Sequence, residues 1–200
     1  MDNLGAFTNN LSELKKLLPK LTSEQIGDMK KLHESSEKHW NRNSLRLKNH
    51  VIKYLLICEA PPASGNYFYK STGDYLFKQV WKCFFGNQPI CSNQNHAYQC
   101  LANIGFLLID TLPYPYGYKS RHRRKPAYHN LIQSYLPVWI GVLNKNFTFS
   151  PDLKIAFGFK LNAHAVIQAS SGTVLLNGIP RTLNTNMIAT TGAGQPSSSL

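Results

Sequence analysis

Residues 54–62 read Tyr54-Leu55-Leu56-Ile57-Cys58-Glu59-Ala60-Pro61-Pro62. The apolar run 54–58 is typical of a buried strand, and it ends at the carboxylate of Glu59. The two prolines that follow disfavour both strand and helix, so Glu59 is expected at the carboxyl end of the strand. Open α/β sheets keep their ligand crevice at that end. Glu59 is therefore the first candidate site residue.

Two further apolar runs, 104–109 and 154–159, follow at intervals that contain helical patterns. Intervals of about 50 residues are too long for hairpins, which predicts right-handed crossovers between parallel strands. The expected fold is α/β, a three-layer α/β/α sandwich with a mostly parallel central sheet. Two shorter runs, 174–176 and 187–190, are predicted to be short strands.

The first 45 residues have a helical pattern of apolar positions, broken at Pro19. The pairs Asn10/Glu13 and Thr22/Gln25 have the spacing of capping boxes, which mark helix starts. We therefore expect two helices that form an N-terminal extension packed on the core. Residues 46–200 would then form the α/β domain.

The composition indicates a folded, basic protein, with 42% hydrophobic and 12% aromatic residues. Lys and Arg total 22 against 10 for Asp and Glu, a formal net charge of +12. This excess favours a polyanionic partner, most simply nucleic acid, although a basic surface without such a partner gives the same count. No apolar run reaches the ~18 to 20 residues of a membrane span, and no signal peptide is visible. We expect a cytoplasmic monomer with no membrane contact.

The chain has four cysteines and no CxxC motif. They are Cys58, Cys83, Cys91 and Cys100. Without metal-ligand spacing they are predicted to be free, mostly buried thiols, with no metal and no cofactor.

Polar side chains follow three of the predicted strands. Glu59 follows the first, Asp110 follows 104–109, and Gln195 follows 187–190. Because parallel strands bring their carboxyl ends to one edge of a sheet, these three residues are expected to converge there.

The order of these motifs over residues 51–199 resembles the uracil-DNA glycosylase superfamily. Residues 58–62 are similar to the family's G-E-A-P-G motif, and residues 65–68 resemble its aromatic turn. Residues 157–163 match its glycine- and alanine-containing strand end, and residues 195–197 stand where the family has H-P-S or N-P-S. Departures are Cys58 and Pro62 in place of glycine, Gln195 in place of histidine, and Asp110 in place of a base-reading asparagine. The amino-terminal cysteine pair of the iron–sulfur branch has no counterpart.

The resemblance implies a DNA glycosylase that hydrolyses the N-glycosidic bond of an extruded uracil-like or modified base and leaves an abasic site. It assigns Glu59 to water positioning and charge stabilisation, with Gln195 in the place of the catalytic histidine. Tyr67 or Phe68 would stack on the base. The alternatives are a salt-bridged or helix-capping Glu59 and aromatic rings that pack in the core.

The same comparison implies phosphate contacts in two loops. The candidates are Ser64, Gly194, Ser197 and Ser198, and Leu200 is a possible wedge residue.

Asp110 gives the most specific hypothesis about the base that is recognised. An asparagine can donate to and accept from uracil, whereas an ionised aspartate only accepts, so an exocyclic amine suits it better. Asp110 either reads a cytosine-like or modified base or is a catalytic carboxylate paired with Glu59. The alternative is a cap of the turn that follows.

A basic cluster lies in the loop 111–126, after the second predicted strand. Its members are Lys119, Arg121, Arg123, Arg124 and Lys125, with His122 between them. The cluster suits phosphate contacts, which His122 would join at low pH. A solvated charge run is the alternative.

Two other functions fit the same residues. The first is a catalytically silent nucleic-acid-binding protein that retains the glycosylase fold, which the missing histidine and asparagine favour. The second is an enzyme that acts on free nucleotides or nucleosides, for which the basic loop would be unnecessary.

Overall fold

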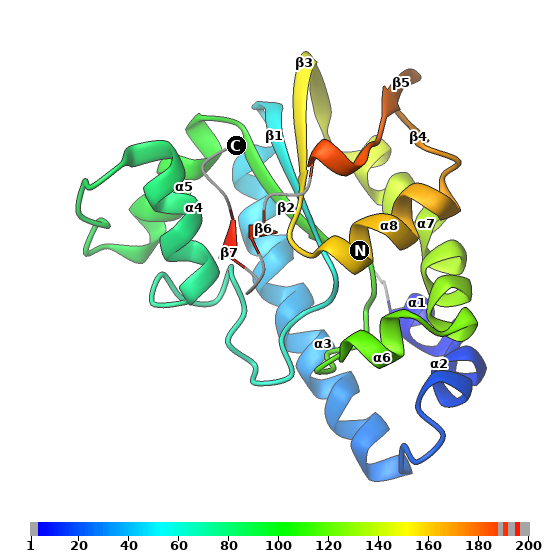
Figure 1. Cartoon of the computed structure of the whole chain (residues 1–200). Coiled ribbons are helices and arrows are strands. Elements are labelled where there is room, and N and C mark those ends of the chain that lie inside the picture. The colour runs from blue at the N-terminus through cyan, green and yellow to red at the C-terminus, as the bar shows by residue number, and fades with distance from the viewer. Residues whose placement is uncertain (1–3, 188–189, 192–194, 197–200) are drawn as a thin grey trace.

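A parallel three-stranded sheet lies at the centre of the fold (Figure 1). The computed structural model describes residues 4–187, 190–191 and 195–196. The strands are β1 (Val51–Cys58), β2 (Phe106–Asp110) and β3 (Thr148–Phe157), in the order β2-β1-β3. Cys58 pairs with Asp110 and Ile57 with Phe157, so all three strands end at the same edge. The expected mixed α/β fold with a parallel sheet is confirmed.

Helices surround this sheet. They are α1 (Leu4–Asn9), α2 (Leu11–Leu17), α3 (Ser23–Ser44), α4 (Tyr75–Phe85), α5 (Gln94–Asn103), α6 (Ser120–Arg123), α7 (Pro126–Asn146) and α8 (Lys160–Ala169), with short 3-10 turns η1 (Leu45–Leu47) and η2 (Thr185–Met187). Two small hairpins complete the described chain, β4 (Thr173–Leu176) with β5 (Ile179–Thr182) and β6 (Thr190–Thr191) with β7 (Gln195–Pro196).

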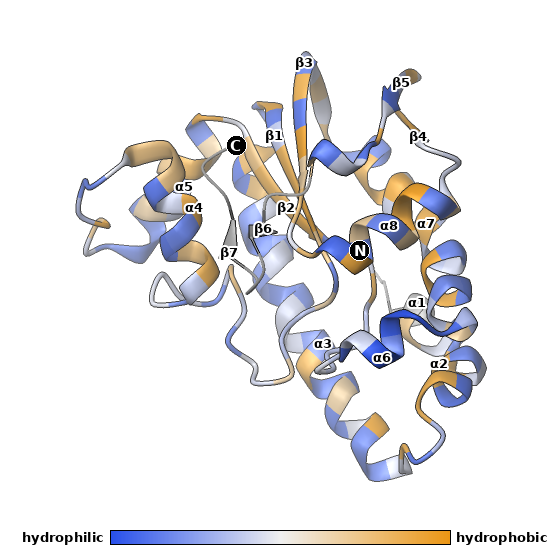
Figure 2. Cartoon of the chain, viewed as in Figure 1, coloured by the Kyte–Doolittle hydropathy of each residue, from blue (hydrophilic) through white to orange (hydrophobic). Residues whose placement is uncertain are grey.

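Alternate residues of β1 enter two different cores. Leu55 and Ile57 pack with α2, α7 and α8, whereas Leu56 and Cys58 pack with α4 and α5. Because successive side chains of a strand point to opposite faces, each face of the sheet has its own helices. Figure 2 shows the strands as largely hydrophobic ribbons between these helices, as expected for strands buried on both faces.

The free edge of β2 is covered by side chains. The indole N–H of Trp40, on α3, donates to the carbonyl of Leu108 at 3.0 Å. The backbone N–H of Leu108 donates to the hydroxyl of Tyr69 at 2.8 Å. An open strand edge is prone to pair with other chains, and these bonds satisfy it instead.

The turn from α5 into β2 requires glycine at position 105. Gly105 has a φ of +76°, and an added Cβ would lie 2.4 Å from the backbone oxygen of Val51. Its carbonyl accepts hydrogen bonds from the backbone N–H groups of Lys53 and Tyr54. This close approach sets the register between β1 and β2.

The N-terminal segment differs in detail from the prediction. It forms three helices instead of two, and Phe7, Leu14 and Leu17 are buried in the same core as α7. The capping box of Thr22 and Gln25 is confirmed, with both bonds present at the start of α3. The one proposed for Asn10 is wrong, because no cap bond from its side chain occurs in the described part of α2.

Of two predictions for the second half of the chain, one needs correction and one is confirmed. The loop 111–126 contains the helix α6. The run 174–176 is a strand, as predicted, and it pairs antiparallel with β5 outside the central sheet.

Candidate active site

A cleft of about 400 Å³ lies at the carboxyl ends of the three central strands. Its walls come from residues 58–63 after β1, Asp110 at the end of β2, residues 158–159 after β3, residues 74–76 at the start of α4, and residues 116–118 with Arg123 near α6. Its size falls within the range of sites for small organic groups. Glu59 and Asp110 both line this cleft, as the strand ends predicted.

Glu59 is held by three hydrogen bonds. The guanidinium of Arg123 donates through Nε to Oε1 at 2.7 Å and through its terminal nitrogen to Oε2 at 2.6 Å. The hydroxyl of Tyr128 donates to Oε1 at 2.6 Å. Only 6% of the Glu59 side chain and 14% of the Arg123 side chain are exposed. The Glu59 carboxyl group therefore has a fixed orientation and is paired with one cation.

A polar network fixes the residues around Glu59. Thr111 donates its hydroxyl hydrogen to the backbone oxygen of Glu59 at 3.0 Å, and Tyr128 donates to the Glu59 carboxylate. The Nδ2 group of Asn162 donates to both hydroxyl oxygens, at 3.0 and 3.1 Å. Because both hydroxyl hydrogens point to Glu59, the amide orientation of Asn162 follows from the network. Its Oδ1 is buried and has no hydrogen-bond partner within the described residues.

Asp110 has different surroundings. It is the last residue of β2, opposite Cys58 in the sheet. Burial raises the pKa of Asp110 to about 7, the hydrogen bond from Tyr67 opposes this rise, and the charge of Glu59 adds to it. A carboxyl group with a pKa near neutrality can take up and release protons under ordinary conditions.

The two predicted stacking residues both line the cleft and are both almost fully buried, Tyr67 at 4% exposure and Phe68 at 2%. Tyr67 lines the cleft and hydrogen-bonds Asp110. Phe68 reaches the cleft wall, but its ring is 2% exposed and packs against Phe77 and Phe106. Phe159 was missed by the sequence analysis. It is 39% exposed in the cleft, and the Arg123 guanidinium lies over its ring at 5.3 Å.

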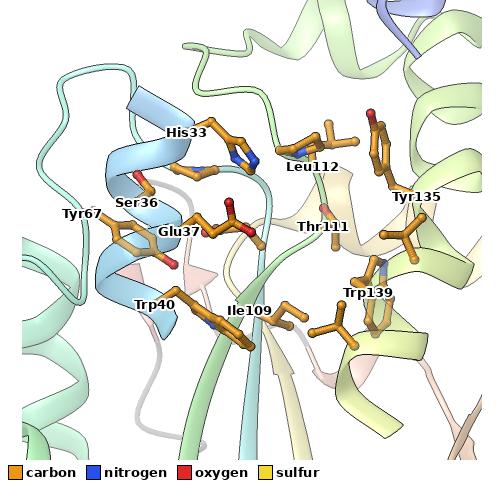
Figure 3. A pocket seen from close by; sticks show the side chains of 15 residues that line it. His33, Ser36, Glu37, Trp40, Tyr67, Ile109, Thr111, Leu112, Tyr135 and Trp139 are labelled. Carbon is orange, nitrogen blue, oxygen red and sulfur yellow. The ribbon is translucent and has the colours of Figure 1, made fainter. Parts of the chain in front are cut away.

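A second, smaller cavity adjoins the cleft (Figure 3). Its volume is about 100 Å³, and it shares Pro61, Tyr67 and Asp110 with the cleft. Figure 3 shows side chains of α3, such as His33, facing side chains of α7, such as Trp139, across this space. One water needs only ~10–15 Å³ of such volume, so the cavity has room for several. Asp110 therefore lines both the cleft and a space large enough to hold water.

The basic cluster surrounds α6. Lys119, Arg121, Arg124 and Lys125 are exposed, and the preceding residues 116–118 form part of the cleft wall. These four cations therefore lie beside the cleft. Arg123 differs because its guanidinium is engaged by Glu59 instead of facing solvent.

His122 does not fit the expectation of a phosphate contact at low pH. It is buried, and burial lowers the pKa of its imidazole, as do the charges of Arg121 and Lys125. Ser64 is exposed in the loop after β1, and its hydroxyl accepts from the backbone N–H of Asn66 at 3.3 Å.

The carboxyl-terminal candidates are only partly described. Gln195 lies in β7, whose neighbours include α4. Gly194, Ser197, Ser198 and Leu200 lie outside the described residues.

The cysteines differ from the expectation of mostly buried thiols. All four are free, but only Cys58 is buried, while Cys83, Cys91 and Cys100 are half-buried.

Comparison with known proteins gives no relative. No protein-family model matches the chain, and no match was found among curated proteins or solved structures. Within the described residues, no helix combines the length and apolarity needed to cross a membrane.

Proposed function

We propose that this chain is a DNA glycosylase, a divergent member of the uracil-DNA glycosylase-like superfamily with a three-layer α/β/α architecture. It would hydrolyse the N-glycosidic bond of an extruded uracil-like or modified base and leave an abasic site. The proposal includes a cytoplasmic monomer that uses no cofactor. The motif order of the sequence and a cleft at the carboxyl ends of parallel strands support it.

The observation that carries the proposal is the pair of carboxylates with opposite surroundings. Glu59 is paired with Arg123 and held by Tyr128, whereas the pKa of Asp110 is raised to about 7. Two carboxyl groups with different hydrogen-bond partners and burial commonly divide the catalytic roles of a site. We assign the proton transfer to Asp110 and the stabilisation of positive charge on the sugar to Glu59.

The reaction then has one proton transfer and one bond exchange. The Asp110 carboxylate takes a proton from water, and the water oxygen bonds to the anomeric carbon of the extruded nucleotide. The carbon–nitrogen bond breaks, and its electron pair leaves with the base. The proton passes from Asp110 to the departing base or to solvent, so that the enzyme returns to its starting state.

Binding of the nucleotide would use the aromatic side chains that line the cleft and the basic residues around α6. The exposed ring of Phe159 offers a face for a base, and Tyr67, whose ring is 4% exposed, contributes to the cleft wall. Lys119, Arg121 and Arg124 would contact phosphates on the strand outside the cleft.

One observation favours a second candidate, the catalytically silent nucleic-acid-binding protein. The charge of Glu59 is already matched by Arg123, which weakens its pull on a positively charged sugar. In that case the cleft would bind an extruded base without cleaving it.

Duplex and single-stranded oligonucleotides carrying uracil, hypoxanthine, thymine mismatches or modified cytosines test these proposals. After incubation, hot alkali cleaves the strand wherever a base has been removed. Cleavage of at least one oligonucleotide by the wild-type chain supports the glycosylase. Salt-sensitive DNA binding without cleavage would instead support the silent binder, and the absence of both would favour an enzyme of free nucleosides.

Asp110→Asn separates the two roles considered for Asp110, with Asp152→Asn as a control at an exposed position of β3. Loss of cleavage on every base supports the catalytic role. Loss on the native base with a gain on uracil would instead make Asp110 a reader of the base, because the amide can donate to a carbonyl. Unchanged cleavage would remove Asp110 from the site.

A further inference from the structure

Three metal-ligating side chains come together away from the cleft. The Sγ atoms of Cys91 and Cys100 and a ring nitrogen of His96 all lie within 4.8 Å of one another. His96 and Cys100 are four residues apart on α5, which places them on one face of that helix. Cys91 lies in the loop between α4 and α5, so the loop brings the third side chain to the helix.

The donor atoms select the kind of ion. Two thiolates and one imidazole form a soft set that suits Zn²⁺, whereas Mg²⁺ and Ca²⁺ prefer oxygen ligands. Two sulfur atoms bound to tetrahedral zinc at ~2.3 Å are separated by about 3.8 Å. The ligand atoms lie at most 4.8 Å apart. To reach the zinc-bound separation, the two sulfur atoms would have to approach each other by about one ångström or less, which side-chain rotation can supply.

The position of the cluster allows an ion to enter. Cys91 and Cys100 are half-buried against the core beneath α4 and α5, while His96 is exposed. The loop is already anchored by the indole N–H of Trp81, which donates to the carbonyl of Gln88 at 3.0 Å. A metal ion would add a second anchor between the loop and α5.

We propose that Cys91, His96 and Cys100 bind one Zn²⁺ ion, with water in the fourth position. The ion fastens the α4–α5 loop to α5, beyond the carboxyl end of α4, whereas the amino-terminal end of α4 contributes to the cleft. Binding releases the thiol protons to solvent and requires no oxidant or reductant. This role is structural and independent of the function proposed for the cleft.

The test uses the full-length reduced protein with Co²⁺ and Zn²⁺ as probes. We expect one Co²⁺ per chain, with the thiolate charge-transfer absorption and the intense visible bands of a tetrahedral site, and displacement by one equivalent of Zn²⁺. Zinc should also raise the melting temperature, because it binds the folded chain in preference to the unfolded one.

Variants locate the ion. Cys91→Ser, His96→Ala and Cys100→Ser should each weaken zinc binding by more than the ~10–100-fold that loss of an outer hydrogen-bond partner costs. Cys83→Ser, at another half-buried cysteine, and His164→Ala, at another exposed histidine, should bind as the wild-type chain does. Melting temperatures of the metal-free variants check that each one folds.

Three outcomes would overturn the proposal. The first is an octahedral Co²⁺ spectrum without thiolate absorption. The second is equal binding by the cluster variants and the controls. The third is that the reduced protein binds no metal and, on exposure to air, forms a disulfide between Cys91 and Cys100.

Discussion

The two carboxylates of the cleft show how neighbouring residues control the state of an acid. Glu59 accepts bonds from a guanidinium and a phenol, which fix its orientation and pair it with a cation. Asp110 lies beside the same cleft, but burial and the charge of Glu59 raise its pKa to about 7. The difference arises from their surroundings, since both residues lie at the carboxyl end of a buried strand.

Asp110 should make the stability of the protein depend on pH. A carboxyl group with a folded pKa of about 7 against an ordinary value of 3.8 binds more protons in the folded state between those limits. The free energy of unfolding should therefore fall as the pH rises from about 4 to about 7. Asp110→Asn should remove this fall and stabilise the chain at pH 8 by about 1–4 kcal/mol. Urea unfolding across this pH range measures the effect.

Asp152→Asn is the control for this experiment and should leave the pH dependence of the wild-type chain in place. An Asp110→Asn variant that keeps the wild-type pH dependence would show that Asp110 is ionised throughout.

Arg123 and Glu59 should depend on each other for stability. Arg123→Met leaves a buried carboxylate without its cation and should lower the free energy of unfolding by about 3–5 kcal/mol. Adding Glu59→Gln to that variant should recover part of the loss, because a neutral amide costs less to bury. Urea denaturation of the single and double variants measures this coupling.

Arg124→Met, at the exposed neighbouring position, should change stability little. A double variant whose losses simply add would mean that the two side chains do not interact.

The residue-level chemistry was only partly accessible from the sequence. Strand ends place Glu59 and Asp110 at one edge, and this much follows from an apolar run that stops at a carboxylate. The pairing of Glu59 with Arg123 joins residues 64 positions apart, and no local pattern encodes it. The role of Asn162 was not predicted either, because a single polar residue in a helical pattern does not indicate a buried hydrogen-bond network.

At the scale of elements, α6 and its flanks carry most of the charge beside the cleft. Replacing Lys119, Arg121 and Arg124 with alanine should weaken binding to all DNA sequences alike. If each side chain contacts one phosphate, the salt dependence on duplex DNA should flatten by up to ~2.7 log units per log salt. Fluorescence anisotropy at several salt concentrations measures the slope.

Lys48, Lys53 and Lys145 provide the matched control. They are exposed and lie near the amino-terminal ends of β1 and β3, at the opposite edge of the sheet. Their replacement with alanine should leave the slope almost unchanged. If both triple variants change the salt dependence of DNA binding equally, the basic residues around α6 form a solvated charge run without specific phosphate contacts.

Helices and strands with long sequence patterns were predicted correctly more often than short ones. Long periodic segments such as α7 and the apolar run of β1 gave correct elements, because many positions contribute to the pattern. The four-residue helix α6 is too short for such a pattern. The pairing of β4 with β5 could not be inferred either. Strand pairing depends on the tertiary surroundings of each strand, which a short local pattern does not reveal.

At the scale of the whole molecule, the central sheet joins two cores. Leu14 lies in the core on one face and Leu101 in the core on the other, and both are almost fully buried. Because β1 contributes residues to both cores, the loss of either should destabilise the whole chain.

Leu14→Ala and Leu101→Ala should each reduce the free energy of unfolding by about 2–5 kcal/mol. Both should shift one common transition seen by circular dichroism and tryptophan fluorescence. Leu45→Ala, at a side chain that is 70% exposed, serves as the control. Separate transitions in either variant would mean that the two cores unfold independently of each other.

The most direct test of the proposed function is the single-turnover rate of base release as a function of pH, measured on the oligonucleotides described above. If Asp110 is the general base, the wild-type rate should rise about tenfold per pH unit below pH 7 and level off above it. Asp152→Asn should follow the same curve, and Asp110→Asn should give a rate that is low at every pH. No base release from any oligonucleotide, or an Asp110→Asn variant with the wild-type profile, would contradict the assignment.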